Sequence, residues 1–135
     1  MFTNGCFDLL HPGHIDYLTR AAALGDKLVI GLNDDNSIRR LKGSQRPVNP
    51  LSDRTTMLTA LRVVDLVIPF SEDTPLRLIR EVLPHTLVKG GDYQADDVVG
   101  ADVVRTHGGQ VVIMPFLAGY SSTALIHRIN QIDTA

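Results

Sequence analysis

Cysteine, aromatic side chains and long apolar runs are all scarce in this sequence of 135 residues. The single cysteine, Cys6, excludes an intramolecular disulfide framework and a cysteine-based zinc site, and it favours a reducing compartment. The apolar runs are far shorter than the roughly 20 residues that a membrane helix needs. No basic-then-apolar leader opens the chain. We therefore expect a cytoplasmic protein that has no membrane segment.

Neither sign of charge dominates, because 13 basic and 15 acidic residues leave a formal charge of −2. This balance, together with the lack of aromatic platforms, argues against nucleic acid as a partner. The hydrophobic fraction of 44% and the charged fraction of 21% are typical of globular proteins. A chain of this length can bury its own core, so we expect one domain over residues 1–135.

Apolar runs alternate with helical patterns along nearly the whole chain. Strands are expected at residues 2–3, 27–32, 65–69, 86–89 and 110–114, and helices at 12–24, 52–62, 75–83, 96–106 and 121–132. The first strand is short because only Met1 precedes it, so its true start could lie upstream. Residues 33–36 and the basic stretch that follows read as a loop. Five strands and five helices in alternation predict an α/β, Rossmann-like, doubly wound five-stranded parallel sheet.

In such a sheet, ligands bind beyond the carboxyl ends of the strands, where the strand order reverses. The polar segments that follow four of the predicted strands are therefore expected to share one rim. They are residues 5–14, 33–36, 89–93 and 119–123.

Two histidines flank a Pro-Gly pair at the predicted start of the first helix, in the stretch His11-Pro12-Gly13-His14. Gly13 lets a phosphate approach the backbone, and the free N–H groups and dipole at a helix start favour an anion. Two imidazoles can donate hydrogen bonds to phosphate oxygens and stabilise charge that builds up on them. The alternative is that one histidine only caps the helix and the other packs on the surface.

The stretch GCFDLLHPGH, residues 5–14, resembles the GxFDxxHxGH signature of the small nucleotidyltransferases of the HxGH superfamily. Downstream, KGSQRPVNPLSDR, VVDLVIPFSEDTP, LVKGGDY and GYSSTALI are similar to the adenylyltransferase half of the heptose kinase/adenylyltransferases, so the resemblance covers residues 2 to about 132. It implies that a heptose 1-phosphate attacks the α-phosphorus of ATP, giving ADP-heptose and pyrophosphate without a covalent intermediate. Mg²⁺ is expected, bound mainly through the ATP phosphates, with no metal-binding residue of the protein.

The resemblance implies catalytic roles for His11 and His14, and for Lys42 as a mobile phosphate clamp. In the first motif it also implies that ATP is bound by Gly5, Cys6, Phe7, Asp8 and Gly13. Asp8 would hold the loop and the substrate end of the motif, or would be only a turn residue. Lys42 has a solvated basic loop as its alternative. Cys6 has no general base beside it and is expected to pack rather than react.

Further binding residues are expected on the other segments of the rim. Asp34 would accept a hydrogen bond from a sugar hydroxyl, with Asp35 as an equal competitor on the residues alone. Arg54 matches a family arginine, and Arg46 is a weaker candidate for the sugar phosphate. The remaining candidates are Lys89, Gly90, Asp92 and Tyr93, which could instead form only a turn, and Ser121, Ser122 and Thr123 at a helix start. The family's C-terminal arginine is absent here, as it is in the heptose branch.

Two other functions stay open on these residues. One is transfer of CMP or AMP to another phosphorylated alcohol, such as glycerol 3-phosphate, because side chains reveal little about the choice of base. The other is a nucleotide-binding sensor that does not turn over. The resemblance also implies a homo-oligomer, a dimer or larger. Because the 135 residues match only the adenylyltransferase half, we expect a separate heptose kinase to supply the phosphorylated sugar.

Overall fold

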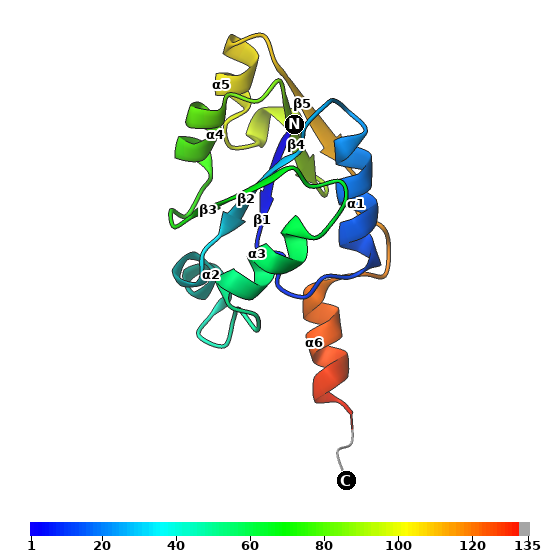
Figure 1. Cartoon of the computed structure of the whole chain (residues 1–135). Coiled ribbons are helices and arrows are strands. Elements are labelled where there is room, and N and C mark those ends of the chain that lie inside the picture. The colour runs from blue at the N-terminus through cyan, green and yellow to red at the C-terminus, as the bar shows by residue number, and fades with distance from the viewer. Residues whose placement is uncertain (133–135) are drawn as a thin grey trace.

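Five parallel strands form one sheet in the computed structural model, which describes residues 1–132 (Figure 1). The strand order is β3-β2-β1-β4-β5, and every neighbouring pair is parallel. The strands are β1 (Phe2–Gly5), β2 (Val29–Asn33), β3 (Leu66–Phe70), β4 (Thr86–Gly90) and β5 (Gln110–Met114). The helices are α1 (Pro12–Ala22), α2 (Asp35–Lys42), α3 (Leu51–Thr59), α4 (Leu76–Val82), α5 (Ala101–Thr106) and α6 (Ser122–Asn130), with a 3₁₀ turn, η1 (Ala95–Asp97).

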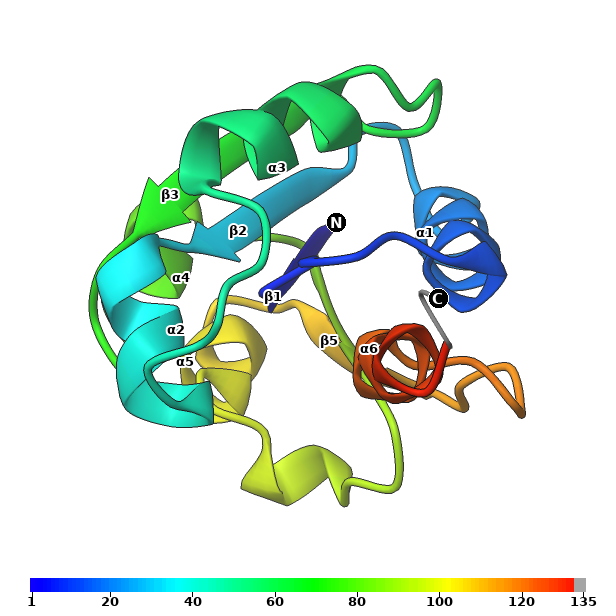
Figure 2. The ribbon, with the colours of Figure 1, turned by 90° about the horizontal axis from the view of Figure 1, so that it is seen from below.

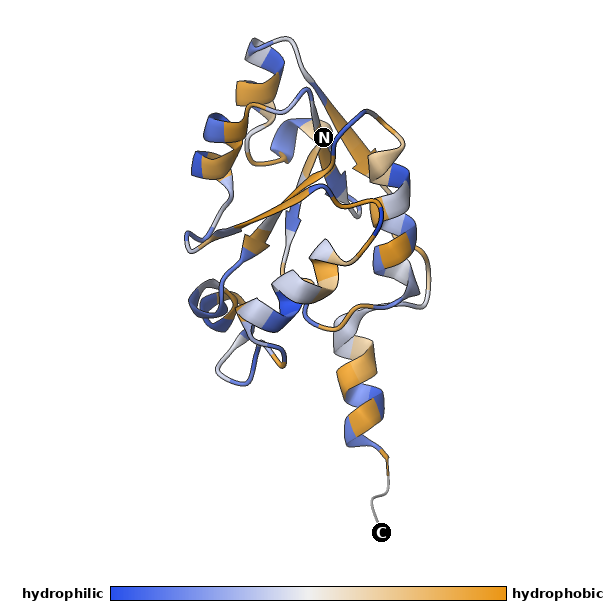
Figure 3. Cartoon of the chain, viewed as in Figure 1, coloured by the Kyte–Doolittle hydropathy of each residue, from blue (hydrophilic) through white to orange (hydrophobic). Residues whose placement is uncertain are grey.

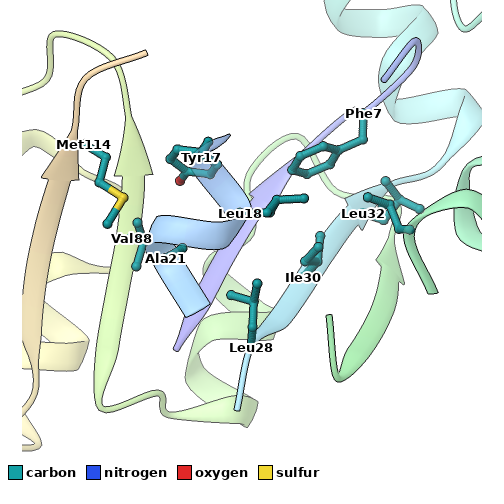
Figure 4. Packing of buried hydrophobic residues seen from close by; sticks show 10 residues of the cluster. Phe7, Tyr17, Leu18, Ala21, Leu28, Ile30, Leu32, Val88 and Met114 are labelled. Atoms are coloured by element: carbon teal, nitrogen blue, oxygen red, sulfur yellow. The ribbon is translucent and has the colours of Figure 1, made fainter. Parts of the chain in front are cut away.

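Helices cover both faces of the sheet, as Figure 2 shows. On one face, Tyr17, Leu18 and Ala21 of α1 pack against alternate residues of the strands, among them Ile30 and Leu32 (Figure 4). On the other face, a second apolar cluster joins Phe2 and Leu87 of the strands to α4 and α5. This alternation of side chains along buried strands produces the doubly wound sheet that the sequence predicts.

The region expected to be a basic loop contains a helix, α2, so the structure has six α-helices in residues 1–132 where five were predicted. The Asp34 side chain caps α2 by accepting from the Ser37 N–H at 2.8 Å. Asp35 lies in the first turn, and basic residues lie in the last turn. These signals favour a helix, but the apolar stripe is weak because Ile38 is the only buried apolar side chain of α2.

The helix predicted at 96–106 is divided into η1 and α5. Gly100 lies between them with φ +88°, and a Cβ at this position would come within 2.8 Å of Ile79 Cδ1. The helix predicted at 52–62 is shorter, because α3 begins at Leu51 after Pro50, has no side-chain cap and ends at Thr59.

The last helix, α6, extends away from the sheet and has no buried residue (Figures 1 and 3). Its first turn nevertheless returns to the body of the protein, because Ser122 Oγ donates to the Leu9 carbonyl at 2.7 Å. No helix in the described part of the chain is both long and apolar enough to cross a bilayer.

Candidate active site

A cavity of about 390 Å³ opens at the carboxyl ends of β1 and β4, the two strands at which the order of the sheet reverses. Three of the four segments predicted to form a shared rim contribute to it: residues from 5–14, from 89–93 and from 119–123. The fourth, 33–36, does not. The loop that follows α2 takes its place and brings Lys42 and Arg46 to the cavity.

The two histidines of the first motif cap the start of α1 reciprocally. The His14 N–H donates to His11 Nδ1, and the His11 N–H donates to His14 Nδ1, both at 3.3 Å. The imidazole rings stack with their centroids 3.8 Å apart. A nitrogen that accepts a hydrogen bond carries no proton, so the neutral rings carry theirs on Nε2. The cap thus leaves Nε2–H of each ring as the donor available to a ligand.

The surroundings of the pair favour neutral imidazoles. Burial, together with the neighbouring His11, lowers the pKa of His14 from 6.5 to about 4. Burial also lowers the pKa of His11. Both rings are therefore mainly neutral at pH 7 and can donate a hydrogen bond through Nε2–H.

The glycine between the histidines is required by space rather than by backbone angle. A Cβ on Gly13 would lie 2.8 Å from His11 Cε1 and 3.0 Å from Tyr120 Cβ, in the mouth of the cavity. Gly13 is the second residue of α1, where a backbone N–H has no partner within the helix. The start of α1 therefore offers an open amide and the positive end of a helix dipole to an anion.

Asp8 is buried, and its carboxylate holds the loop that precedes α3. One oxygen accepts from Arg46 Nε at 2.9 Å and from the Val48 N–H at 2.8 Å, and the other accepts from the Asn49 N–H at 2.9 Å. Burial by itself would raise the pKa of Asp8, but these three donors outweigh it and lower the pKa. Asp8 lines the cavity, and in this structure it holds the loop, which is the first half of its predicted role.

The basic side chains of the cavity outnumber its acidic ones. Lys42, Arg46 and Lys89 line it, and Asp8 is the only carboxylate that does. Lys89 Nζ lies 4.9 Å from the centre of the Tyr93 ring, in a cation–π contact. Because the carboxylate is matched by Arg46, two positive charges remain without a partner charge in the lining. The cavity is electrostatically suited to a polyanion.

Large apolar side chains form a wall that sequence reasoning missed. Phe116, Leu117 and Tyr120 line the cavity, and each of them is exposed. Asn4 and the buried Tyr17 line it as well. A Cβ on Gly90 would collide with Phe116 Cε1, so the aromatic ring lies directly against the glycine backbone. Tyr17 could have been found, since it follows His14 by three residues on the same helical face. The other three lie on an irregular loop that has no such pattern.

The residues predicted to bind a ligand at the start of α6 lie at the cavity. Ser121, Ser122 and Thr123 all line it. The Ser121 side chain caps α6 by accepting from the Ala124 N–H at 2.9 Å. The starts of α1 and α6 therefore face the same cavity, and both favour anions.

Four predicted binding residues lie outside the cavity lining: Asp34, Arg54, Asp92 and Tyr93. Asp34 is occupied as the cap of α2. Cys6 does line the cavity, and burial raises the pKa of its thiol, in agreement with a packing role.

Arg54 departs furthest from its predicted role of binding a ligand, because its side chain is 0% exposed. Its guanidinium donates to three backbone carbonyls, those of Asn49, Cys6 and Asn33, at 3.0, 2.9 and 2.7 Å. It also pairs with Asp35 at 2.8 Å. All its nitrogens therefore bind protein oxygens, and the arginine joins the ends of β1 and β2 to α2 and α3.

Comparison with known proteins agrees with this arrangement. The family model described as "Cytidylyltransferase-like" matches residues 2–128. The chain belongs to this family. A solved structure, the lipopolysaccharide core biosynthesis protein of Thermoplasma volcanium GSS1, is 30% identical and covers 86% of this chain and 93% of its own, with a TM-score of 0.67.

Two curated proteins that resemble this cytidylyltransferase-like chain carry the same name. The bifunctional protein HldE of Halorhodospira halophila is 60% identical over 131 residues, which are 97% of this chain and 28% of that protein. The bifunctional protein HldE of Coxiella burnetii (strain RSA 493 / Nine Mile phase I) is 54% identical over 129 residues, which are 96% of this chain and 27% of that protein. The chain thus spans just over a quarter of the length of these relatives.

Proposed function

We propose that this chain transfers AMP from ATP to D-glycero-β-D-manno-heptose 1-phosphate, giving ADP-heptose and pyrophosphate. The observation that carries the proposal is the stacked, reciprocally capped pair His11 and His14 in a basic cavity at the switch point of the sheet. Membership of the cytidylyltransferase-like family supports nucleotidyl transfer. The high identity to HldE and the likeness to a lipopolysaccharide core biosynthesis protein support a heptose as the acceptor.

In this proposal the triphosphate of ATP lies across the starts of α1 and α6. The Nε2–H groups of His11 and His14 donate to its oxygens, and Lys42 and Lys89 balance its charge. The acceptor phosphate attacks the α-phosphorus, an oxygen–phosphorus bond forms, and the bond to pyrophosphate breaks. Negative charge grows on the departing pyrophosphate, where the histidines stabilise it. The nucleoside lies toward Gly90 and the exposed aromatic wall, between residues that give flat apolar contact.

Mg²⁺ fits this cavity only as a companion of the nucleotide. Within residues 1–132, no three side chains of His, Cys, Asp or Glu come together in a way that could hold a metal ion. The one carboxylate in the lining, Asp8, already accepts from three protein donors. Phosphate oxygens and water would therefore be the ligands of Mg²⁺, which neutralises phosphate charge when bound.

The substrate must be made by a kinase that phosphorylates a heptose at its anomeric oxygen, on a separate protein or on another part of a longer chain. We place both steps in the cytoplasm, where ATP is available. A homo-oligomer is a further expectation, to be measured by light scattering coupled to size-exclusion chromatography.

Release of pyrophosphate from a matrix of substrates tests the proposal. The nucleotides are ATP, CTP, GTP and UTP, and the acceptors are heptose 1-phosphate, glycerol 3-phosphate and phosphopantetheine. We expect release with ATP and heptose 1-phosphate alone. Release with CTP and glycerol 3-phosphate would keep the chemistry and replace the substrates. Tight ATP binding without release for any pair would favour a sensor.

A matched pair of variants separates catalysis from binding. His14→Ala should lower kcat by about 100-fold to 1,000-fold, as loss of a donor to developing charge does elsewhere, with a small change in ATP affinity. His85→Ala, at an exposed histidine outside the cavity, should leave both unchanged. A loss of ATP binding in His14→Ala with no turnover to lose would contradict the catalytic role.

A further inference from the structure

Arg46 lines the cavity, and the reaction steps proposed so far give it no role. Its side chain is only 14% exposed, and its Nε donates to Asp8 at 2.9 Å. The two terminal nitrogens have no hydrogen-bond partner within residues 1–132. They are not buried without a partner either, so they reach the solvent of the cavity. An arginine that is held at Nε and free at its terminal nitrogens presents a two-pronged donor to a phosphate group.

The segment that carries Arg46 is hydrogen-bonded to the same motif that carries the two histidines. Asp8 lies three residues before His11, and it accepts from Arg46, Val48 and Asn49. The Asn49 side chain completes the clamp by donating to the Asp8 carbonyl at 2.9 Å. Four hydrogen bonds therefore hold the 46–49 segment against the first motif. These hydrogen bonds therefore fix the position of the Arg46 guanidinium relative to the histidine pair.

The position of Arg46 points to the acceptor rather than to ATP. The anion-binding helix starts and Lys89 come from β1, β4 and the segment after β5, whereas Arg46 comes from the segment between β2 and β3. Direct displacement at phosphorus needs the attacking and leaving groups on opposite sides of the α-phosphorus. If pyrophosphate leaves over the helix starts, the nucleophile needs a separate cation, and Arg46 is a clamped cation of the lining whose segment contributes neither helix start.

Resting on the proposed function, we propose that Arg46 binds the phosphate monoester of the acceptor, and that Asp8 is the positioning residue that aims it. The selected chemical class is a phosphate monoester dianion on a sugar. Lys42 ends α2, a few residues before Arg46, but its side chain is exposed, so it can reach the triphosphate and lacks the fixed geometry of Arg46. Arg46 would thus decide which acceptors react, while the helix starts hold the nucleotide.

The test compares Arg46→Gln with Arg39→Gln, a control at an exposed arginine outside the cavity. Arg46→Gln should raise the KM for heptose 1-phosphate by 10-fold to 100-fold, with the dissociation constant of ATP changed by less than 3-fold. Arg39→Gln should change neither. Arg46→Lys, which keeps the charge but loses the fork, should lie between. An equal loss of ATP affinity, or an unchanged acceptor KM, would overturn the proposal.

A double-mutant cycle tests the positioning role of Asp8. Asp8→Asn should raise the acceptor KM as Arg46→Gln does, and the two changes together should be no worse than Arg46→Gln alone. Purely structural damage would instead weaken ATP binding as well, and the effects would add.

Failure of the proposed function can be told apart from failure of this inference. If the wild-type protein uses another phosphorylated acceptor, the KM of that acceptor should show the same shift. If the wild-type protein turns over no pair of substrates, the increase in melting temperature caused by inorganic phosphate tests whether Arg46 binds an anion. Its loss in Arg46→Gln and retention in Arg39→Gln would support the anion site, and equal stabilisation of both variants would refute it.

Discussion

A substitution of Arg54 can show whether this residue binds a ligand or stabilises the fold. Replacing it with methionine keeps a long apolar stem but removes every donor of the guanidinium. Three carbonyls, those of Cys6, Asn33 and Asn49, then lose their hydrogen bonds, and Asp35 loses its partner. Because the residue is fully buried, water cannot easily replace these contacts.

The expected loss of stability follows from these contacts. An unsatisfied buried polar group costs about 1–3 kcal/mol, and breaking one side of a buried ion pair costs about 3–5 kcal/mol. Asp35 is 31% exposed and regains some water, and because one guanidinium makes all these contacts, their costs overlap rather than add. We expect Arg54→Met to lower the free energy of unfolding by about 3–5 kcal/mol, a large share of the roughly 5–15 kcal/mol typical of a domain.

Urea unfolding followed by circular dichroism measures this change, since the chain has no tryptophan. The control, Arg62→Met, alters an exposed arginine and should stay within about 0.5 kcal/mol of wild type. Arg54→Lys should recover part of the loss, because an ammonium keeps the charge but cannot reach acceptors on several sides. Wild-type stability combined with lost nucleotide binding in Arg54→Met would refute the structural role and restore the binding role.

Three more outcomes are expected. The pKa of His14 is lower in the folded protein, about 4, than its usual 6.5, so the unfolded chain binds more protons between these values. Stability should be constant above pH 6.5 and fall by at most roughly 3 kcal/mol as the pH drops to 4, less where solvent screens the ring, and His14→Gln should flatten this slope in urea titrations at several pH values. Gly109→Ala should destabilise the fold by several kcal/mol in the same assay, because its Cβ would lie 2.7 Å from the His85 carbonyl; normal stability would contradict the tight approach. Tyr17→Phe should lower stability by about 1–2 kcal/mol, since the Thr3 hydroxyl loses its 2.7 Å partner, and an unchanged midpoint would show that water replaces it.

Parts of the fold could be predicted because their signals are local. Strands such as 110–114 are short apolar runs between turn residues, and the structure has the same bounds for β5. α2 was missed because its caps are strong but its apolar stripe is nearly absent, so hydrophobic periodicity could not find it. The division of the helix at Gly100 depends on Ile79, a neighbour 21 positions away, and no local pattern contains that contact.

The sequence by itself determined the class of fold, the histidine motif and the edge of the sheet where the candidate site would lie. The apolar residues alternate between strand and helix spacing along the chain, and this predicts the order of strands and helices. Right-handed crossovers then restrict the sheet to a few topologies. The His-Pro-Gly-His stretch also acts locally, because a capping box needs only residues within one turn.

Only the tertiary structure decided which charged residues line the cavity and which ones hold the fold together. Asp8, Asp34 and Arg54 look alike as polar residues near a rim, yet the first clamps a loop, the second caps a helix and the third is buried between strand ends. Their partners lie up to 48 positions away in the chain. A long polar side chain can meet a ligand or a distant carbonyl equally well, and only the packing of the whole chain selects between them.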